Sequence, residues 1–240
     1  MAYHEFAEVN MEYFESWTKR AEPGGPMWAL NLMKYKEWAE YADGRETTLT
    51  GLEADEAYAP FDHMARFGAR VILIAPVVHQ LVGDDTHWER IAIAQFPKRM
   101  ALLEMSADAD FQKAEEHKDA GMDVSIGMAA FPIEGQPVPK QESAADSDRL
   151  MLIQVVADAN APDLAVGIDA VRAGRLEVED KFMGDHRTFA EARFDLISPA
   201  TAKELASRKY VHDDTGYTVI TDPSVDDVAR SLSDTTRVIF

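Results

Sequence analysis

A proline-rich joint divides this sequence into two parts. Residues 132–148 contain three prolines and a long polar run, with almost no large apolar side chain. Such a composition is typical of a linker, because the segment has few apolar side chains that could pack into a hydrophobic core. Of the 240 residues, we therefore assign 1–131 to a first domain with an N-terminal helix and 149–240 to a second domain with a C-terminal helix.

The first domain alternates strand and helix patterns. Short apolar runs predict strands, and apolar residues at three- and four-residue spacing predict amphipathic helices. After a helix at 5–20, the predicted strands cover residues 27–35, 70–82, 86–96 and 124–131, and the predicted helices cover residues 53–67 and 98–119. We expect the last helix in two pieces, with Ser106 capping the second and Gly121 ending it in a left-handed conformation.

The second domain repeats this order in a shorter form. Its predicted strands cover residues 150–156, 175–182, 188–197 and 217–221. A helix at 162–173 is expected to end at Gly174, a second begins after Ser198 with Pro199 at its first position, and a third covers 224–231. The pattern predicts an α+β fold of two tandem βαββαβ modules.

Charge and composition exclude several classes of partner and cofactor. The formal net charge of -19 repels nucleic acid and anionic membranes. The chain has no cysteine, which excludes disulfides, thiolate zinc sites and iron–sulfur clusters. It also lacks a glycine-rich phosphate loop and an apolar run long enough to span a membrane. We expect a cytoplasmic protein that needs no cofactor and binds no metal.

One segment carries a resemblance to a known family. The run from Arg90 to Pro97, followed by a two-piece helix with Ser106 and Phe111, resembles the dimeric α/β barrel superfamily. The nearest resemblance within it is to a bacterial family of unknown function, here as a tandem fusion. The resemblance implies ferredoxin-like units that pair into a pseudo-dimeric barrel, with a ligand cleft between sheet and helices. Gln95 stands where that family usually has Glu, which removes a possible acid/base group.

Strand alternation suggests a catalytic pair in the first domain. If the hairpin loop comprises residues 83–86, His79 lies opposite Arg90 on a face that is rich in small residues. Small side chains leave volume for a pocket, in which His79 would act as base and Arg90 as oxyanion partner. Alternatively, the small residues let helices pack closely and both side chains are structural. A slip of one residue would put His79 beside Glu89 instead.

Further candidates surround this pair. Asn31, Tyr35, Trp88 and His63 are predicted to orient the ligand, although His63 also suits a solvated helix face on which Asp62 and Arg66 form a pair. His117 could ligate haem iron or belong to a charged surface run. His87 and Glu89 share a strand face but have no third ligand, so no metal site is predicted.

The second domain carries charged strand faces. Two sets of alternating side chains define them: Glu177, Glu179 and Lys181, and Glu191, Arg193 and Asp195. Either these residues are solvated and paired across strands, or they line a polar barrel interior.

These observations favour a small-molecule enzyme without a nucleotide cofactor. It would perform acid/base chemistry of the isomerase, cyclase or cofactor-free oxygenase type on an enolisable or aromatic oxygenated compound. Two alternatives stay open: a non-catalytic ligand-binding or assembly protein, and a haem-binding protein. The expected partner is a small-molecule ligand, and both monomer and homodimer are compatible with the sequence.

Overall fold

The structure, a computed structural model, describes residues 6–19, 21, 25–136, 143–145, 147–211 and 215–237. The strands are β1 (Glu8–Val9), β2 (Met27–Tyr35), β3 (Arg70–Val82), β4 (Arg90–Phe96), β5 (Met122–Pro132), β6 (Leu150–Val156), β7 (Ala170–Gly184), β8 (Glu191–Ile197), β9 (Gly216–Thr221) and β10 (Val225–Asp226). The helices are α1 (Met11–Trp17), α2 (Gly51–Tyr58), α3 (Phe61–Arg66), α4 (Arg99–Ser106), α5 (Ala109–Gly121), α6 (Pro199–Ser207) and α7 (Val228–Arg237).

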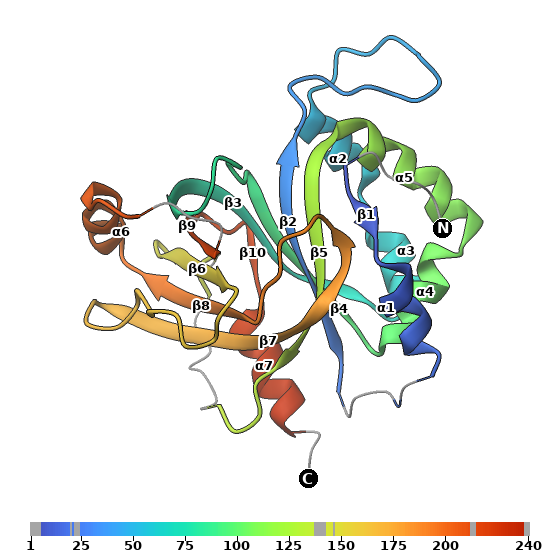
Figure 1. Cartoon of the computed structure of the whole chain (residues 1–240). Coiled ribbons are helices and arrows are strands. Elements are labelled where there is room, and N and C mark those ends of the chain that lie inside the picture. Colours follow the sequence, from blue (N-terminus) through green and yellow to red (C-terminus); the bar gives the residue numbers. More distant parts are fainter. Residues whose placement is uncertain are drawn as a thin grey trace.

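The strands form one antiparallel sheet that closes on itself. Their order is β1-β7-β5-β2-β4-β3-β9-β6-β8, with β10 paired to β3. Because β7 also pairs with β8, eight of these strands make a closed barrel (Figure 1). A closed sheet leaves few unpaired strand edges, and β1 adds to the barrel from outside by pairing with β7.

The prediction of two βαββαβ modules is wrong. The chain forms a closed antiparallel barrel, and its second part has no helix between β6 and β7. The predicted helix at 162–173 is replaced by turns that lead into β7, and Gly167 in these turns has a φ of 82°. A left-handed glycine interrupts a helix, and from Ala170 onward the chain pairs with β8. The apolar spacing here reflects packing of a turn and a strand, not a helix face.

Two other predicted helices are shorter than expected. The helix predicted at 53–67 is broken into α2 and α3, because Ala59 takes a left-handed φ of 30° and Pro60 follows it. The one predicted at 5–20 is α1 alone within the described residues, and it begins after Asn10, whose side chain accepts a hydrogen bond from the backbone N–H of Tyr13.

The helix predicted at 98–119 does form in two pieces, α4 and α5. Its caps differ from the prediction, because Asp108 and not Ser106 caps α5, by accepting from the backbone N–H of Phe111. Gly121 does not take a left-handed conformation, since α5 runs directly into β5. Residues 137–142 and 146 of the predicted linker lie outside the described residues.

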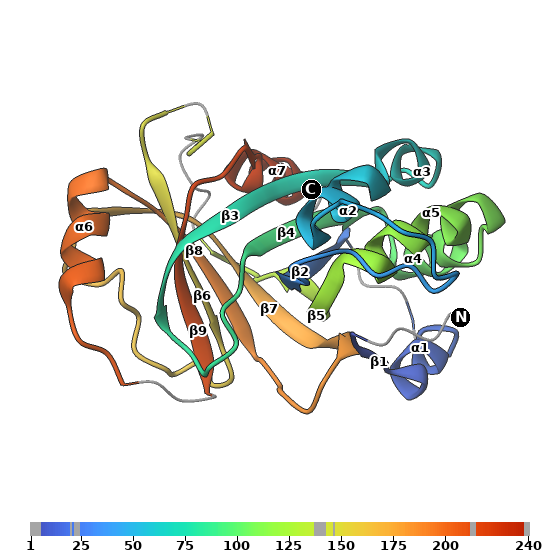
Figure 2. The ribbon, with the colours of Figure 1, turned by 90° about the horizontal axis from the view of Figure 1, so that it is seen from above.

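The helices are distributed unevenly around the barrel. Helices α1 to α5 gather against the outer face of the sheet around β2, β4 and β5, whereas α6 lies at the far side of the barrel (Figure 2). None of the helices in the described part of the chain is long and apolar enough to cross a membrane.

Alternation along the strands separates an interior from an outer core. Trp28, Leu30 and Leu32 of β2 are fully buried and point into the barrel, where they meet Ile91 and Ile93 of β4. The intervening residues of β2 point outward under the helices. The barrel interior is therefore packed with large apolar side chains.

A close backbone contact fixes the position of α2. The N–H of Gly51 donates to the carbonyl of Lys36 at 3.1 Å, and the N–H of Lys36 donates to the carbonyl of Gly121 at 2.9 Å. A Cβ added to Gly51 would overlap the carbonyl oxygens of both Gly121 and Lys36. The start of α2 is thus held against the end of α5 by a contact that only glycine permits.

Replacing this glycine tests the contact. We expect Gly51→Ala to lower the free energy of unfolding by about 3 kcal/mol, because α2 must move away from the backbone of α5. Gly44→Ala is the control: a Cβ added to Gly44 meets nothing within 4 Å, although Gly44, unlike Gly51, has a positive φ, of 73°. We expect it to cost about 1 kcal/mol in backbone strain alone. Equal losses in urea unfolding would show that the contact does not constrain α2.

Candidate functional site

A cavity lies between the outer face of the barrel and the helices. It has a volume of about 390 Å³, and its walls come from β2, β3, β4, β7 and the N-terminal segment as well as from α1 to α5. Cross-strand neighbours form its floor, with Asn31 opposite Ala92 and Ala29 opposite Ala94. Small side chains at these positions leave the volume open between sheet and helices.

Most of the wall is apolar. The large apolar side chains around the cavity are Phe6, Val9, Phe14, Met33, Phe61, Met64, Val71, Ile74, Ile93, Phe96, Leu102, Met105, Phe111, Phe182 and Met183. The charged side chains on the wall are Asp55 and Glu56 of α2, Arg90 of β4, and Glu115 and Lys118 of α5. A few charges in an apolar surrounding can fix the orientation of a ligand.

The central polar feature is an ion pair between α2 and β4. Arg90 Nη1 donates to Asp55 Oδ2 at 3.0 Å, and the two side chains are only 14% and 9% exposed. The hydroxyl of Tyr35 donates to the same oxygen, Asp55 Oδ2, at 2.8 Å. Arg90 also approaches Glu56, with 3.4 Å between Nη2 and Oε1. Asp55 Oδ1 accepts no hydrogen bond from the residues that the structure describes.

The sequence around α2 explains why Asp55 reaches this position. Thr50 caps the helix by accepting from the N–H of Glu53, while the Glu53 carboxylate accepts from the N–H of Thr50. This capping box and the left-handed Ala59 define a helix of only two turns. Its buried residues, Gly51 and Ala54, keep the chain close to α5 and turn Asp55 toward the sheet.

Both tyrosines at the site are held in the neutral form. Burial raises the pKa of Tyr35 far above its usual value, and the neighbouring carboxylate of Asp55 raises it further. Burial likewise raises the pKa of Tyr58 well above its usual value, with smaller contributions from the charges of Glu115 and Asp55. Each phenol is therefore a hydrogen-bond donor at neutral pH.

The predicted pair of His79 and Arg90 is not formed. Arg90 lies opposite Pro76, whereas His79 lies opposite Ile220 of β9 and is exposed. The connection between β3 and β4 covers residues 83–89 rather than a four-residue loop, and β4 begins later than expected. Irregular registers between β3 and its neighbours also change the parity on which the prediction relied. His79 does not line the cavity.

The ligand-orienting residues predicted from sequence divide into two groups. Asn31 lines the cavity and Tyr35 lies behind it as the partner of Asp55. Trp88 is buried in the barrel interior, with its ring 5.5 Å from that of Tyr217. His63 stands on α3 with its ring 5.9 Å from that of Phe111 and does not line the cavity.

The remaining predicted groups lie away from the cavity. His117 Nδ1 lies 2.8 Å from the hydroxyl of Tyr41, a contact that joins α5 to the loop after β2. Arg66 pairs with Asp108 at 2.8 Å rather than with Asp62. No cluster of potential metal ligands occurs among the described residues, His87 included.

Sequence reasoning missed Asp55, Glu56 and Lys118, whereas Tyr58 stands beside His63 in the helix predicted at 53–67, where a tyrosine facing the cleft is a candidate ligand-binding group. The capping box at Thr50 was a usable signal, since it fixes the register of α2 and puts Asp55 and Tyr58 on one helix face at three-residue spacing. Which strand that face would meet depends on contacts far apart in the chain.

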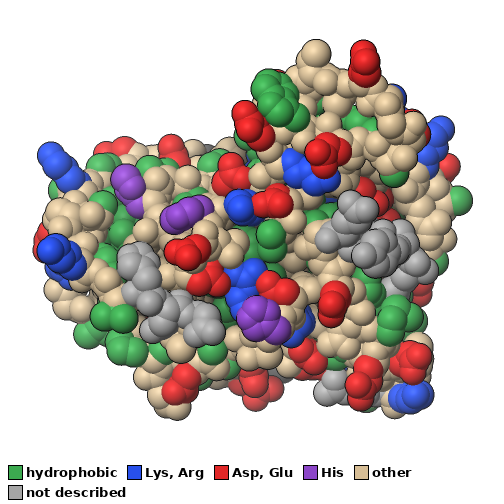
Figure 3. Space-filling view, turned by 45° about the horizontal axis from the view of Figure 1, so that its top comes forward, with side chains coloured by type: hydrophobic (Ala, Val, Ile, Leu, Met, Phe, Trp, Pro, Cys, Tyr) green, Lys and Arg blue, Asp and Glu red, His purple; other side chains and the backbone are tan. Residues whose placement is uncertain are grey.

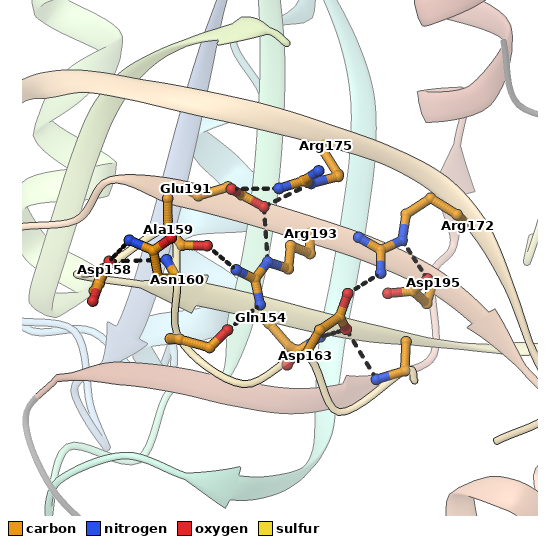
Figure 4. Close-up of polar contacts among 12 residues, drawn as sticks. Gln154, Asp158, Ala159, Asn160, Asp163, Arg172, Arg175, Glu191, Arg193 and Asp195 are labelled. Carbon is orange, nitrogen blue, oxygen red and sulfur yellow. Dashed lines mark hydrogen bonds and ion pairs between the residues drawn. The ribbon is translucent and has the colours of Figure 1, made fainter. Parts of the chain in front are cut away.

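The charged face of the second part forms a buried ion network. Arg175 and Arg193 both bind Glu191, at 2.7 Å each, and Arg172 Nε binds Asp195 at 2.6 Å (Figure 4). The chain segment before β7 covers these groups, and the carbonyls of Ala159 and Ala161 accept from Arg193. The network lies outside the barrel interior and is paired across strands, as between Arg172 of β7 and Asp195 of β8. Its arginines are partly solvated, since Arg172 and Arg175 are 32% and 39% exposed. Its arginines on β7 and β8 bind carboxylates of the barrel and also groups of the covering segment, as Arg172 does with Asp163.

Asp195 is the most perturbed carboxyl in this network. Burial raises its pKa to about 6, against the opposing effect of Arg172. One of its oxygens, Oδ2, is buried with no hydrogen-bond partner among the described residues. Such a carboxyl favours the protonated form.

The raised pKa predicts a pH-dependent stability. Between about pH 4 and pH 6 the folded protein binds the Asp195 proton more tightly than the unfolded chain does, so the free energy of unfolding falls as the pH rises through this window. The fall attributable to Asp195 is at most about 3 kcal/mol. We expect Asp195→Asn to reduce this slope in urea unfolding, and exposed Asp222→Asn to leave it unchanged. The same slope in wild type and Asp195→Asn would contradict the assignment.

Comparisons with known proteins give few similar structures. No protein-family model matches the chain, and no curated protein matches it. Two solved structures of the RPA0582 protein, described as of unknown function from Rhodopseudomonas palustris, are 30% and 28% identical, with TM-scores of 0.49 and 0.47. They cover 54% and 53% of this chain and 96% of their own.

A more distant neighbour covers more of the chain. A mutant chlorite dismutase from Candidatus Nitrospira defluvii, in complex with cyanide, is 8% identical over 89% of this chain and 96% of its own, with a TM-score of 0.41.

Proposed function

We propose that the cavity binds a small, largely apolar oxygenated compound and that Asp55 and Arg90 perform acid/base chemistry on it. The observation that carries this proposal is the Asp55–Arg90 pair, which is largely buried on the wall of an otherwise apolar cavity. A buried ion pair contributes little net stability compared with apolar packing, so its position beside a cavity favours a functional role.

The hydrogen bonds around Asp55 suit a general base. Tyr35 and Arg90 both engage Oδ2, which orients the carboxylate and leaves Oδ1 for a ligand. In an enolisable compound, Oδ1 would accept a proton from the carbon beside a carbonyl, and that proton would return to another carbon to complete an isomerisation. Arg90 would stabilise the negative charge on the enolate oxygen.

The position of His79 gives no support to its role as base, since it lies exposed on β3 and outside the cavity wall. Haem binding also lacks support. Within the described residues no histidine lines the cavity, and His117 contacts Tyr41 elsewhere. The proposed chemistry therefore rests on the carboxylate of Asp55.

Ligand binding can be tested with a neutral fluorescent probe. N-phenyl-1-naphthylamine is apolar and aromatic, and we expect its fluorescence to rise on binding to the wild-type protein. Ala92→Phe adds a ring to the cavity floor and should weaken binding about tenfold or more, because it occupies the space of the probe. Ala65→Phe, on the exposed side of α3, is the matched control and should bind normally. Equal binding by both variants would place the probe outside the cavity.

The acid/base role can be tested separately. Phenylpyruvate in deuterium oxide exchanges the protons beside its carbonyl, and NMR follows the exchange. We expect wild-type protein to accelerate it and Asp55→Asn to remove at least about a hundredfold of that acceleration, the usual contribution of a general base. The variant should still bind N-phenyl-1-naphthylamine. Exchange at the wild-type rate in Asp55→Asn would exclude Asp55 as the base.

A further inference from the structure

We propose that Lys118 and Tyr58 bind a carboxylate on the cavity's ligand, so that the ligand is an apolar or aromatic carboxylic acid. This inference rests on the proposed function and names the class of compound that the cavity takes. The reason is that some polar groups on the cavity wall already bind other residues, whereas Lys118 and Tyr58 have no polar partner among the described residues.

Lys118 has no counter-ion among the residues that the structure describes. Its Nζ lies 5.9 Å from the ring centroids of both Phe6 and Tyr58, on the cavity wall. It forms no ion pair with any residue in the described ranges, whereas Arg90 is already paired with Asp55 and Glu56. An ammonium group among aromatic rings loses part of its hydration and gains from an anionic partner. A ligand anion would supply that partner.

Tyr58 adds a hydrogen-bond donor at the same place. Its hydroxyl makes no hydrogen bond to the residues that the structure describes, although its ring packs edge-on against Phe111 with 5.9 Å between centroids. The raised pKa of Tyr58 keeps this hydroxyl protonated. An ammonium and a phenol together match the two oxygens of one carboxylate.

The spacing along α2 connects this pair to the proposed base. Asp55 and Tyr58 are three residues apart on the same helix, so they lie on one face about 4.5 Å apart along the axis. A ligand whose carboxylate meets Tyr58 and Lys118 would present a carbon a few bonds away to Asp55 and Arg90. This arrangement suits an aromatic acid that carries a second oxygen near its carboxylate.

A pair of matched probes separates charge recognition from binding in general. 8-Anilinonaphthalene-1-sulfonate and N-phenyl-1-naphthylamine share one aromatic framework, and only the first carries an anionic group, which stands in for the carboxylate. Both are titrated by fluorescence into wild type, Lys118→Gln, Lys118→Arg and Tyr58→Phe. Lys113→Gln, on the exposed side of α5, is the charge-matched control.

We expect Lys118→Gln to weaken binding of the sulfonate about tenfold and to leave binding of the neutral probe unchanged, as for loss of a hydrogen bond to a charged group. Lys118→Arg should retain most of the affinity, Tyr58→Phe should show a smaller loss of the same kind, and Lys113→Gln should show none. Unchanged sulfonate binding in Lys118→Gln, or equal losses for both probes, would overturn the inference. If wild-type protein binds neither probe, the proposed ligand site itself is refuted. This result is seen with wild type alone, and it is therefore distinguishable from failure of the present inference, which only the variants reveal.

Discussion

Strand β7 hydrogen-bonds to β5 along one edge and to β8 along the other, and this double pairing closes the barrel. Closure fixes the curvature of the whole sheet and directs alternate side chains into an interior that apolar residues fill. Functional groups are therefore confined to the outer faces, which the chain covers in two different ways. Helices cover one face and enclose a cavity, whereas the segment before β7 covers the other face and contacts its charged side chains.

Charged side chains are paired differently under the segment before β7 and under the helices. Under the segment before β7, three arginines meet three carboxylates, so the buried charges balance within the protein: Arg172, Arg175 and Arg193 against Asp163, Glu191 and Asp195. Around the cavity, the pairing is incomplete among the described groups, since Lys118 has no counter-ion there. On the face that Figure 3 shows, acidic side chains are scattered over the surface, in keeping with the net charge of -19. An unbalanced charge next to a cavity is what distinguishes the helical side.

Much of the local structure could be predicted from sequence, and the long-range structure could not. The bounds of β2, β3 and β6 follow from apolar runs, and Ser198 caps α6 as expected. Alternation along β4 also puts Arg90, Ala92 and Ala94 on one face. The helix expected at 162–173 failed because turns and a strand can show the same apolar spacing as a short helix.

The site shows the same division. The partner of Arg90 depends on the length of the connection after β3 and on irregular strand registers. Neither could be predicted from the local sequence pattern. Asp55 occupies an ordinary position in a short amphipathic helix, and its role depends on Arg90, 35 residues later, and on the glycine contact that aligns α2. Contacts of this kind are set by the tertiary fold and override local pattern.

The N-terminal segment has a consequence for how the cavity wall is held in place. Phe6, Val9 and Phe14 form part of the wall, yet β1 joins β7 through only two residue pairs, supplemented by the bonds of Asn10 to the carbonyls of Lys181 and Phe182. The segment is instead anchored by buried aromatic side chains, Phe6, Phe14 and Trp17, which belong to the core under the helices. Since β1 stands outside the ring of eight strands, closure of the barrel does not depend on this segment, and the cavity wall and the scaffold are held by separate sets of contacts.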